Sequence, residues 1–310
     1  MPWTVETIER LDALLVRNLA PHSRSRIEKL IREGLVTIDG QVVTKPGTKL
    51  RIRQVVECPI PEEQAPQDLT PVEMPLDILY EDEDVIVLVK QRGIAVHPAP
   101  GLKDEATLVQ GLLHYSEKLS DEAGSFRPGI VHRLDKDTTG IMMIARNNVS
   151  HQRLAEQVRL RTAERRYVAG VRGRPDLDLF TVNAPLGQDP RHPMKRAIRD
   201  DGKPAVTHFR VLGRLEEGTL LGVRLETGRT HQIRVHLVSI GLPVLGDRLY
   251  APAKYASGPL QLHAAWLSFT HPTTGEVMAF FAPPPEDFEG RDQITEATMN
   301  PWTRSVSPPI

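Results

Sequence analysis

A segment of 26 residues without Lys or Arg separates two basic parts of the chain. Residues 59–84 carry nine Asp and Glu, and five prolines interrupt them. Proline removes backbone donors and like charges repel one another, so this composition favours an extended linker. We therefore expect a linker over 59–84 between a small domain, 1–58, and a larger domain, 85–290. A polar, proline-containing tail, 291–310, should follow.

The acidic segment also explains the net charge of −1. The net charge is +3 over residues 1–58, −9 over 59–84 and +5 over 85–310. Residues 146–174 alone hold eight Arg and two Glu. Near-neutrality therefore does not exclude a nucleic-acid partner, although a solvated basic face is the alternative interpretation of the Arg-rich segment.

Composition limits the class of protein. Hydrophobic residues make up 40% and charged residues 25% of the 310 residues, as in ordinary globular proteins. No apolar run approaches a membrane span, and the N-terminus lacks a signal-peptide pattern. The single cysteine, Cys58, excludes an internal disulfide and a cysteine-based zinc site. These features predict a cytoplasmic protein without a membrane partner.

The first 58 residues predict two helices followed by a hairpin. Leu11, Leu14 and Leu15 recur at helical spacing, and residues 25–28 form a capping-box pattern before a second helix that Gly34 ends. Asp39-Gly40 lies between two short apolar runs, which is a strong hairpin signal. The second helix carries four basic residues, whose ordinary interpretation is a solvated face: Arg24, Arg26, Lys29 and Arg32.

The run over residues 23–56, SRSRIEKLIREGLVTIDGQVVTKPGTKLRIRQVV, resembles the S4 RNA-binding module. This resemblance implies a small α/β domain that contacts the RNA backbone through its basic second helix and adjoining hairpin. It implies binding and no chemistry.

The larger domain alternates short strands and helices. Expected strands are 85–90, 141–145, 167–171, 207–212, 221–225 and 277–281, and expected helices are 108–115, 151–160 and 230–240. Because a helix does not follow each strand, a mixed α+β fold fits better than a doubly wound parallel sheet. Residues after about 287 are expected to fray.

Three segments concentrate polar residues at expected strand ends. The segment 129–140 places Asp135 and Asp137 in a dense polar turn, which suits either an active site or a structural ion-pair network. The segment 165–171 places Tyr167 on one face of a strand, where it is either a core residue or a stacking platform for a base.

The third segment, 225–236, ends a strand and starts a helix that we expect Thr230 to cap. Arg229 lies at the mouth of this turn, in a position to pair with a carboxylate. His231 and His236 are five residues apart, a spacing that does not align two metal ligands on one helical face. We interpret both as hydrogen-bonding residues.

Together these segments resemble the RluA-type pseudouridine synthases, and specifically their RluD-like branch. The motifs are HRLDKDTTG at 132–140, RRYVAGV at 165–171 and LETGRTHQIRVH at 225–236, with shorter matches such as GDRLY at 246–250. Two positions depart from the family pattern. Thr139 replaces the usual Ser and keeps its hydroxyl, and Arg165 replaces the usual Lys and keeps its charge.

The resemblance implies isomerisation of uridine to pseudouridine in RNA by a fold with a mixed, mainly antiparallel central sheet and a catalytic cleft. Asp135 matches the catalytic aspartate, which acts as a nucleophile or as a base. Arg229 matches the arginine that pairs with it, and Tyr167 matches the tyrosine that stacks on the target base. Arg133 and Arg165 are expected to contact RNA.

No metal or organic cofactor is needed for this reaction, because the fragments of the substrate recombine. The expected partner is 23S ribosomal RNA or the large ribosomal subunit rather than DNA, and the expected state is a monomer. The same reaction on another RNA, such as a tRNA or another rRNA site, is an alternative.

Two other classes are weaker alternatives. Residues 135–139 imitate the D-x-D-x-T motif of Mg²⁺-dependent phosphatases, but His132 and Arg133 interrupt the apolar strand that this motif requires. A non-catalytic S4-type RNA-binding factor is the other alternative. The joint presence of Asp135, Tyr167 and Arg229 argues against it.

Overall fold

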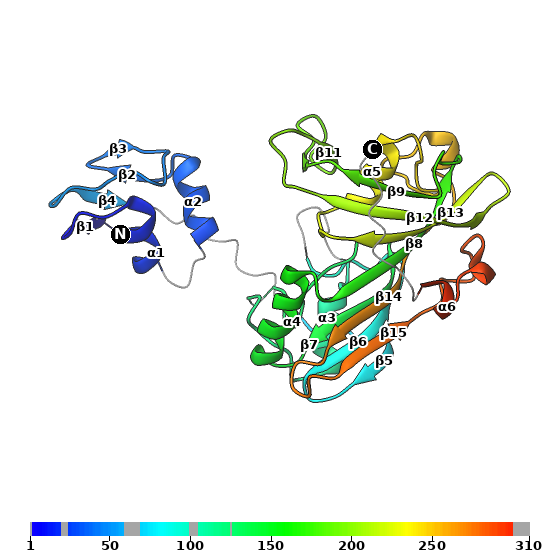
Figure 1. The fold of residues 1–310 in the computed structure, drawn as a ribbon. Helices are drawn as coiled ribbons and strands as arrows, with labels where there is room; N and C mark the ends of the chain where they lie inside the picture. The colour runs from blue at the N-terminus through cyan, green and yellow to red at the C-terminus, as the bar shows by residue number, and fades with distance from the viewer. Residues whose placement is uncertain (1, 20–23, 59–68, 99–104, 125, 300–310) are drawn as a thin grey trace. The chain divides into compact units, whose positions relative to one another are not determined.

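In the computed structural model the chain divides into two compact units, residues 1–68 and 69–310 (Figure 1). The structure describes residues 2–19, 24–58, 69–98, 105–124 and 126–299. The part of the expected linker over 59–68 lies outside the described residues.

The N-terminal unit combines two helices with a small sheet. The helices are α1 (Leu11–Asn18) and α2 (Arg24–Arg32). The sheet has the order β1-β4-β2-β3, with β1 (Pro2–Thr4), β2 (Thr37–Ile38), β3 (Gln41–Val42) and β4 (Val55–Glu57). The expected hairpin is confirmed, because Asp39 and Gly40 both have the positive φ of a tight two-residue turn.

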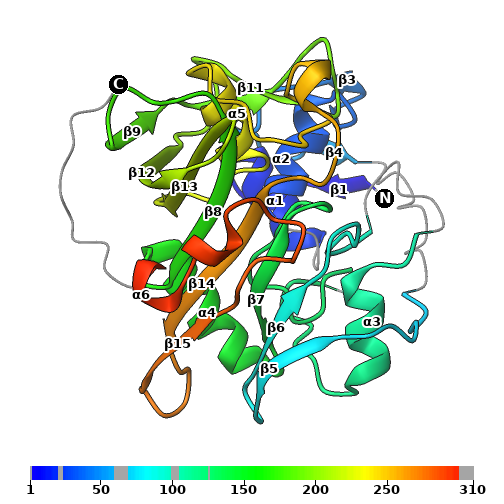
Figure 2. The same ribbon diagram turned by 90° about the vertical axis from the view of Figure 1, so that its right-hand side faces the viewer.

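The larger unit is built on a nine-stranded sheet (Figures 1 and 2). Its order is β5-β6-β7-β14-β8-β13-β12-β9, and β15 also pairs with β14. The strands are β5 (Asp77–Glu81), β6 (Val85–Lys90), β7 (Thr139–Ala145), β8 (Glu164–Arg172), β9 (Leu179–Asn183), β12 (Val206–Arg214), β13 (Gly218–Leu225), β14 (Leu262–Thr270) and β15 (Val277–Phe281).

The sheet is mixed and mainly antiparallel, which confirms the expected α+β class. In the described sheet β7 and β14 pair in parallel, and the other pairings are antiparallel. Ala264 on β14 pairs with Gly140 on one side and with Tyr167 on the other. This register brings the segment before β7 to the same level of the sheet as Tyr167.

The longer helices of the described part of this unit pack near the sheet. They are α3 (Leu108–Tyr115), α4 (Asn148–Leu160) and α5 (Gln232–Ser239). Figure 2 shows α3 beside β5 and β6, where Leu108 and Leu112 join the core of Ile86 and Leu88. None of the described helices is long and apolar enough to cross a membrane.

A short hairpin, β10 (Leu186–Gln188) and β11 (Arg196–Ile198), forms a separate two-stranded sheet near α5. The Arg196 N–H on β11 donates to the Tyr250 hydroxyl oxygen at 2.7 Å, which ties the hairpin to the segment after α5.

The structure corrects three expectations. The acidic segment was expected to remain a linker up to residue 84, but Asp77–Glu81 forms β5. This strand is stabilised because it pairs antiparallel with β6. Residues after about 287 were expected to fray, but Ile294 and Met299 are buried against the sheet (4% and 0% exposed), and residues 296–299 form α6 (Glu296–Met299). The rest of the expected tail, 300–310, lies outside the described residues. Thr230 was expected to cap the helix that follows it, but α5 begins one residue later, after His231.

Replacing Ile294 with Ala tests the packing of this C-terminal segment. A buried Ile→Ala change removes apolar contact and leaves a cavity, so we expect the free energy of unfolding to fall by about 2–4 kcal/mol. The matched change Val277→Ala, at a position 77% exposed, should alter it by less than about 0.5 kcal/mol. Urea denaturation of both variants measures the difference, and equal unfolding midpoints would contradict the packing.

Candidate active site

Asp135 lies in the polar segment that precedes β7, and a buried lysine holds this segment in place. Lys90, at the end of β6, is fully buried, and its Nζ donates to the carbonyls of Gln91, Ile94 and Lys136 at 2.8–2.9 Å. The Gly93 N–H donates to the same Lys136 carbonyl at 3.0 Å. The residue after Asp135 is therefore fixed by two donors from the β6 side.

The charge of Lys90 is set by opposing effects. Burial lowers the pKa of Lys90 to about 7, while the negative charges of Asp135 and Asp137 oppose that fall. Three carbonyl acceptors need three N–H donors, which only the ammonium form supplies. The hydrogen-bond geometry therefore favours the charged lysine beneath the two aspartates.

The other end of the segment is fixed where it enters β7. The Gly140 φ is +120°, and a Cβ there would lie 2.3 Å from the Ala264 carbonyl oxygen, so the close approach of β7 to β14 requires glycine. The Thr139 hydroxyl contacts Nδ1 of His263 at 2.8 Å. The threonine that departs from the family pattern thus uses the hydroxyl it retains.

Arg234 is the cation that pairs with Asp135. Its Nη1 lies 3.0 Å from Oδ2 of Asp135, and its Nε and Nη2 donate to both oxygens of the buried Asp247 at 2.7 Å. Burial disfavours the charge of Arg234, but the hydrogen bonds and charges of the two aspartates outweigh it and raise the pKa of Arg234. The guanidinium is therefore permanently charged and fixed beside Asp135.

The expected pair of Asp135 with Arg229 is not formed. Arg229 lies exposed at the rim, where its Nε donates to the Pro204 carbonyl at 3.2 Å. The chain turns through a left-handed conformation at His231 (φ 58°) before α5 begins, and the buried face of α5 then carries Arg234 to the carboxylate. The pairing role belongs to the arginine five residues later in the same motif.

Tyr167 lies with Asp135 around one pocket of about 380 Å³, a size typical of small-molecule sites. The tyrosine is 4% exposed, and burial raises the pKa of its hydroxyl. An aromatic ring and an ion pair that line one pocket can together hold a planar, polar group. The pocket is also lined by Leu134, Thr138, Ile233 and Leu262.

Arginines surround this pocket. Arg133 Nη1 contacts His97 Nε2 at 3.1 Å, and Arg161 pairs with Glu226 at 3.0 Å. Both side chains, together with Arg159, Arg165 and Arg229, line the pocket. The Arg-rich segment recognised in the sequence therefore supplies part of a basic rim around Asp135.

A buried hydrogen-bond network fixes the start of α5. Gln232 accepts from the Thr227 hydroxyl and the Arg229 N–H, and its amide donates to the Val206 carbonyl and the Thr207 hydroxyl, all at 2.8–3.0 Å. The Thr207 hydroxyl contacts His236 Nδ1 at 2.8 Å. His236 is thus a hydrogen-bonding residue, as expected.

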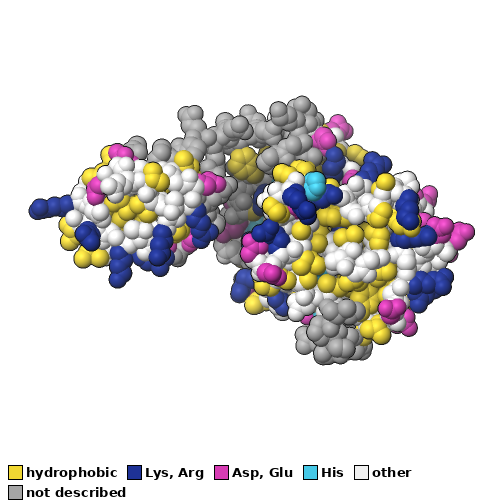
Figure 3. All heavy atoms as spheres, turned by 90° about the horizontal axis from the view of Figure 1, so that it is seen from above, with side chains coloured by type: hydrophobic (Ala, Val, Ile, Leu, Met, Phe, Trp, Pro, Cys, Tyr) yellow, Lys and Arg dark blue, Asp and Glu magenta, His cyan; other side chains and the backbone are white. Residues whose placement is uncertain are grey.

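The N-terminal unit carries basic side chains of its own. On the face shown in Figure 3, several Lys and Arg side chains lie along one edge of this unit. Arg32 is exposed, and its Nη2 lies 3.2 Å from Oε2 of Glu28. Arg24, Arg26 and Lys29 belong to α2, but their side chains lie outside the described part of the structure.

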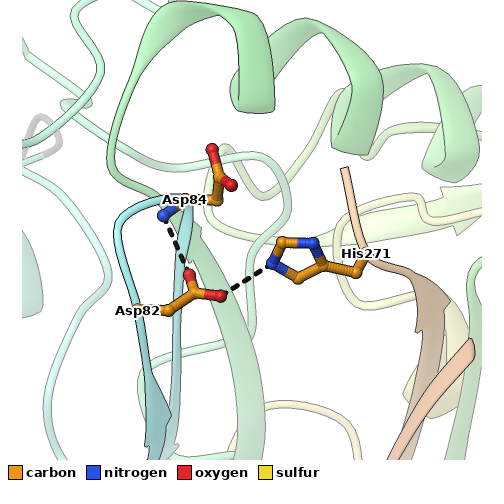
Figure 4. A group of neighbouring side chains, drawn as sticks. All are labelled: Asp82, Asp84 and His271. Atoms are coloured by element: carbon orange, nitrogen blue, oxygen red, sulfur yellow. Dashed lines mark hydrogen bonds and ion pairs between the residues drawn. The ribbon is translucent and has the colours of Figure 1, made fainter. Parts of the chain in front are cut away.

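One cluster of possible metal ligands lies apart from the pocket: Asp82, Asp84 and His271 (Figure 4). The Thr274 N–H donates to His271 Nδ1, so His271 Nε2 carries the proton that it donates to Asp82 at 2.8 Å. Hydrogen bonds, that of Ser150 above all, lower the pKa of Asp84 to about 2. These hydrogen bonds connect the β5–β6 turn to the segment after β14, and we interpret the cluster as structural.

Three residues of the site were given no role by the sequence analysis: Lys90, Arg234 and Asp247. Arg234 stands among apolar residues in IRVHLV, and a charged side chain in such a helix needs a buried partner. Lys90 ends an apolar strand in the same way. A charged residue within an apolar run could have signalled a buried ion pair or hydrogen bond. It does not identify the residue that pairs with it.

Comparison with known proteins follows the same division of the chain. Residues 84–239 match the family described as RNA pseudouridylate synthase, and residues 9–56 match the S4 domain. The chain therefore belongs to the RNA pseudouridylate synthase family. It is an RluA-type RNA pseudouridine synthase, an isomerase, with an N-terminal S4 RNA-binding domain.

Relatives align along nearly the whole chain. An uncharacterized RNA pseudouridine synthase of Bacillus subtilis is 44% identical over 280 residues, covering 90% of this chain and 91% of that protein. Ribosomal large subunit pseudouridine synthase D of Vibrio vulnificus is 40% identical over 296 residues, covering 90% and 88%. These alignments favour a pseudouridine synthase over the two weaker alternatives, a Mg²⁺-dependent phosphatase and a non-catalytic RNA-binding factor.

A solved structure shares the fold of the larger unit. Human RNA Pseudouridylate Synthase Domain Containing 4 is 26% identical, has a TM-score of 0.52, and covers 68% of this chain and 90% of its own.

Parallel Arg→Lys changes distinguish the two arginines of the third motif. Lysine has one ammonium group and cannot contact both aspartates as the guanidinium does, so Arg234→Lys should lower the rate of pseudouridine formation about tenfold or more. Arg229→Lys keeps a cation at the rim and should stay within about threefold of the wild type. Single-turnover rates on RNA measure both, and the opposite order would restore the pairing role to Arg229.

Proposed function

We propose that this enzyme isomerises specific uridines of large-subunit (23S) ribosomal RNA, with Asp135 as the reactive carboxylate. The observation that carries the chemistry is the Asp135–Arg234 ion pair, which lines the same pocket as Tyr167. The rRNA target is supported by the S4 domain and by relatives named ribosomal large subunit pseudouridine synthase D.

The reaction moves one glycosidic bond. The C1′–N1 bond breaks, the uracil turns, C1′ bonds to C5, the C5 proton leaves and N1 gains a proton. Asp135, as an ionised carboxylate beside a permanent cation, can attack the ribose or the uracil, or can act as a base toward the substrate. Tyr167 stacks on the base, and Arg234 keeps the carboxylate oriented.

The target base must leave its helix stack to reach Asp135, at a cost of a few kcal/mol. Stacking on Tyr167 returns about 1–3 kcal/mol. Arg133, Arg159, Arg161, Arg165 and Arg229 surround the pocket, where they can contact the phosphates on either side of the flipped nucleotide. The S4 unit adds contacts to the RNA backbone through four basic residues of α2: Arg24, Arg26, Lys29 and Arg32.

Mapping of pseudouridines in cells with and without the gene tests the target. We expect one or a few 23S rRNA uridines to lose their carbodiimide-dependent primer-extension stops when the gene is deleted, and to regain them with the wild-type gene. Loss of pseudouridine from a tRNA, with 23S rRNA unchanged, would instead support the alternative substrate. The same map in cells carrying Asp135→Asn separates the loss of activity from the loss of the protein.

A further inference from the structure

His231 adopts a backbone conformation that L-residues avoid. Its φ is 58° and ψ is 17°, in the left-handed region, directly before α5. That conformation costs about 1–2 kcal/mol in a residue with a Cβ, and glycine or asparagine fits it more easily. A partly buried histidine at this position indicates that its side chain is used.

The His231 imidazole contacts the Tyr250 hydroxyl through Nδ1. His231 Nδ1 lies 2.8 Å from the Tyr250 hydroxyl oxygen, and the two rings meet edge to face at 5.5 Å. The same oxygen accepts the Arg196 N–H at 2.7 Å. Because an amide N–H can only donate, the Tyr250 hydrogen is free to point at Nδ1, which then leaves the proton on Nε2.

The protonated side of the ring faces Asp135. His231 Nε2 lies 4.0 Å from Oδ2 of Asp135, the oxygen that Arg234 contacts at 3.0 Å. Burial lowers the pKa of His231, although the Asp135 charge opposes the fall, so the ring is neutral at neutral pH. A neutral ring with Nε2–H presents a second donor to the carboxylate without adding another cation beside Arg234.

Tyr250 also contacts Arg234, the cation of the site. The Arg234 guanidinium lies 5.0 Å from the centre of the Tyr250 ring, and the Tyr250 N–H donates to Asp247 at 3.1 Å. One tyrosine therefore touches both groups that face Oδ2 of Asp135.

We propose that Tyr250 and His231 are positioning residues for Asp135: the Tyr250 hydroxyl fixes the His231 tautomer that directs Nε2–H at Oδ2. Because Arg234 Nη1 contacts Oδ2 at 3.0 Å and His231 Nε2 faces the same oxygen at 4.0 Å, the other carboxylate oxygen is left for the ribose or the base. The inference rests on the proposed role of Asp135. It adds a second N–H donor near this carboxylate, His231, and the residue that orients that donor, Tyr250.

Two substitutions at His231 separate this role from a purely structural role in the turn. In His231→Gln the amide nitrogen can take the place of Nε2 and keep a donor near Asp135. In His231→Asn the amide reaches only the position of Nδ1, toward Tyr250, but asparagine suits the left-handed backbone better. A turn role predicts that Asn is the better replacement, whereas a positioning role predicts that Gln is.

The assay is tritium release from total RNA labelled at uridine C5 and isolated from cells lacking the gene, under single-turnover conditions. Loss of orienting partners commonly costs about 10–100-fold, so we expect His231→Asn to lower the rate by that factor, with RNA affinity unchanged. His231→Gln should recover at least part of this loss. Tyr250→Phe, which removes only the hydroxyl, should slow the step by several fold.

Tyr115→Phe is the matched control, because the Tyr115 hydroxyl donates to Glu81 at 2.6 Å on the exposed end of α3. It should leave the rate unchanged, and urea midpoints show that each variant is folded. The inference is overturned if His231→Asn equals or exceeds His231→Gln, or if Tyr250→Phe matches the control. Asp135→Asn, run alongside, tests the proposed function separately: full activity in that variant overturns the role of Asp135 itself.

Discussion

A single arginine held between two aspartates organises the site. Arg234 occupies the buried space between Asp135 and Asp247 with hydrogen bonds of 2.7–3.0 Å. A buried guanidinium needs such partners, because removing one side of a buried ion pair costs about 3–5 kcal/mol. The ion pair therefore connects the loop before β7, helix α5 and the segment after it, and the position of Asp135 depends on all three.

The surrounding polar contacts act on the same loop from different directions. Lys90 and Gly93 hold the Lys136 carbonyl, Gly140 permits the close approach to β14, and Gln232 fixes the start of α5. Lys90 and Gln232 are buried and hydrogen-bonded, as a low-dielectric interior requires. The carboxylate is thus placed by the packed sheet rather than by a mobile loop.

Much of this arrangement could be predicted from the sequence, and the rest could not for physical reasons. Apolar patterning predicted strand β6 and helix α3 with their bounds, and the motifs predicted that Asp135 and Tyr167 share a site. Patterning missed β5 because its acidic and proline-rich surroundings are typical of a linker. The family resemblance and the position of Arg229 at the strand-to-helix turn gave the pairing role to Arg229. The left-handed turn at His231 places Arg234 there instead, and local sequence rules assign that conformation to glycine or asparagine.

The central claim is that Asp135, held by Arg234, reacts with the target nucleotide. Its most direct test is tritium release by Asp135→Asn compared with Asp137→Asn, a matched change two residues away on the exposed side of the same segment. The account predicts no detectable release by Asp135→Asn with RNA affinity unchanged, and near-wild-type release by Asp137→Asn. Turnover by Asp135→Asn, or loss of activity only in Asp137→Asn, would contradict it.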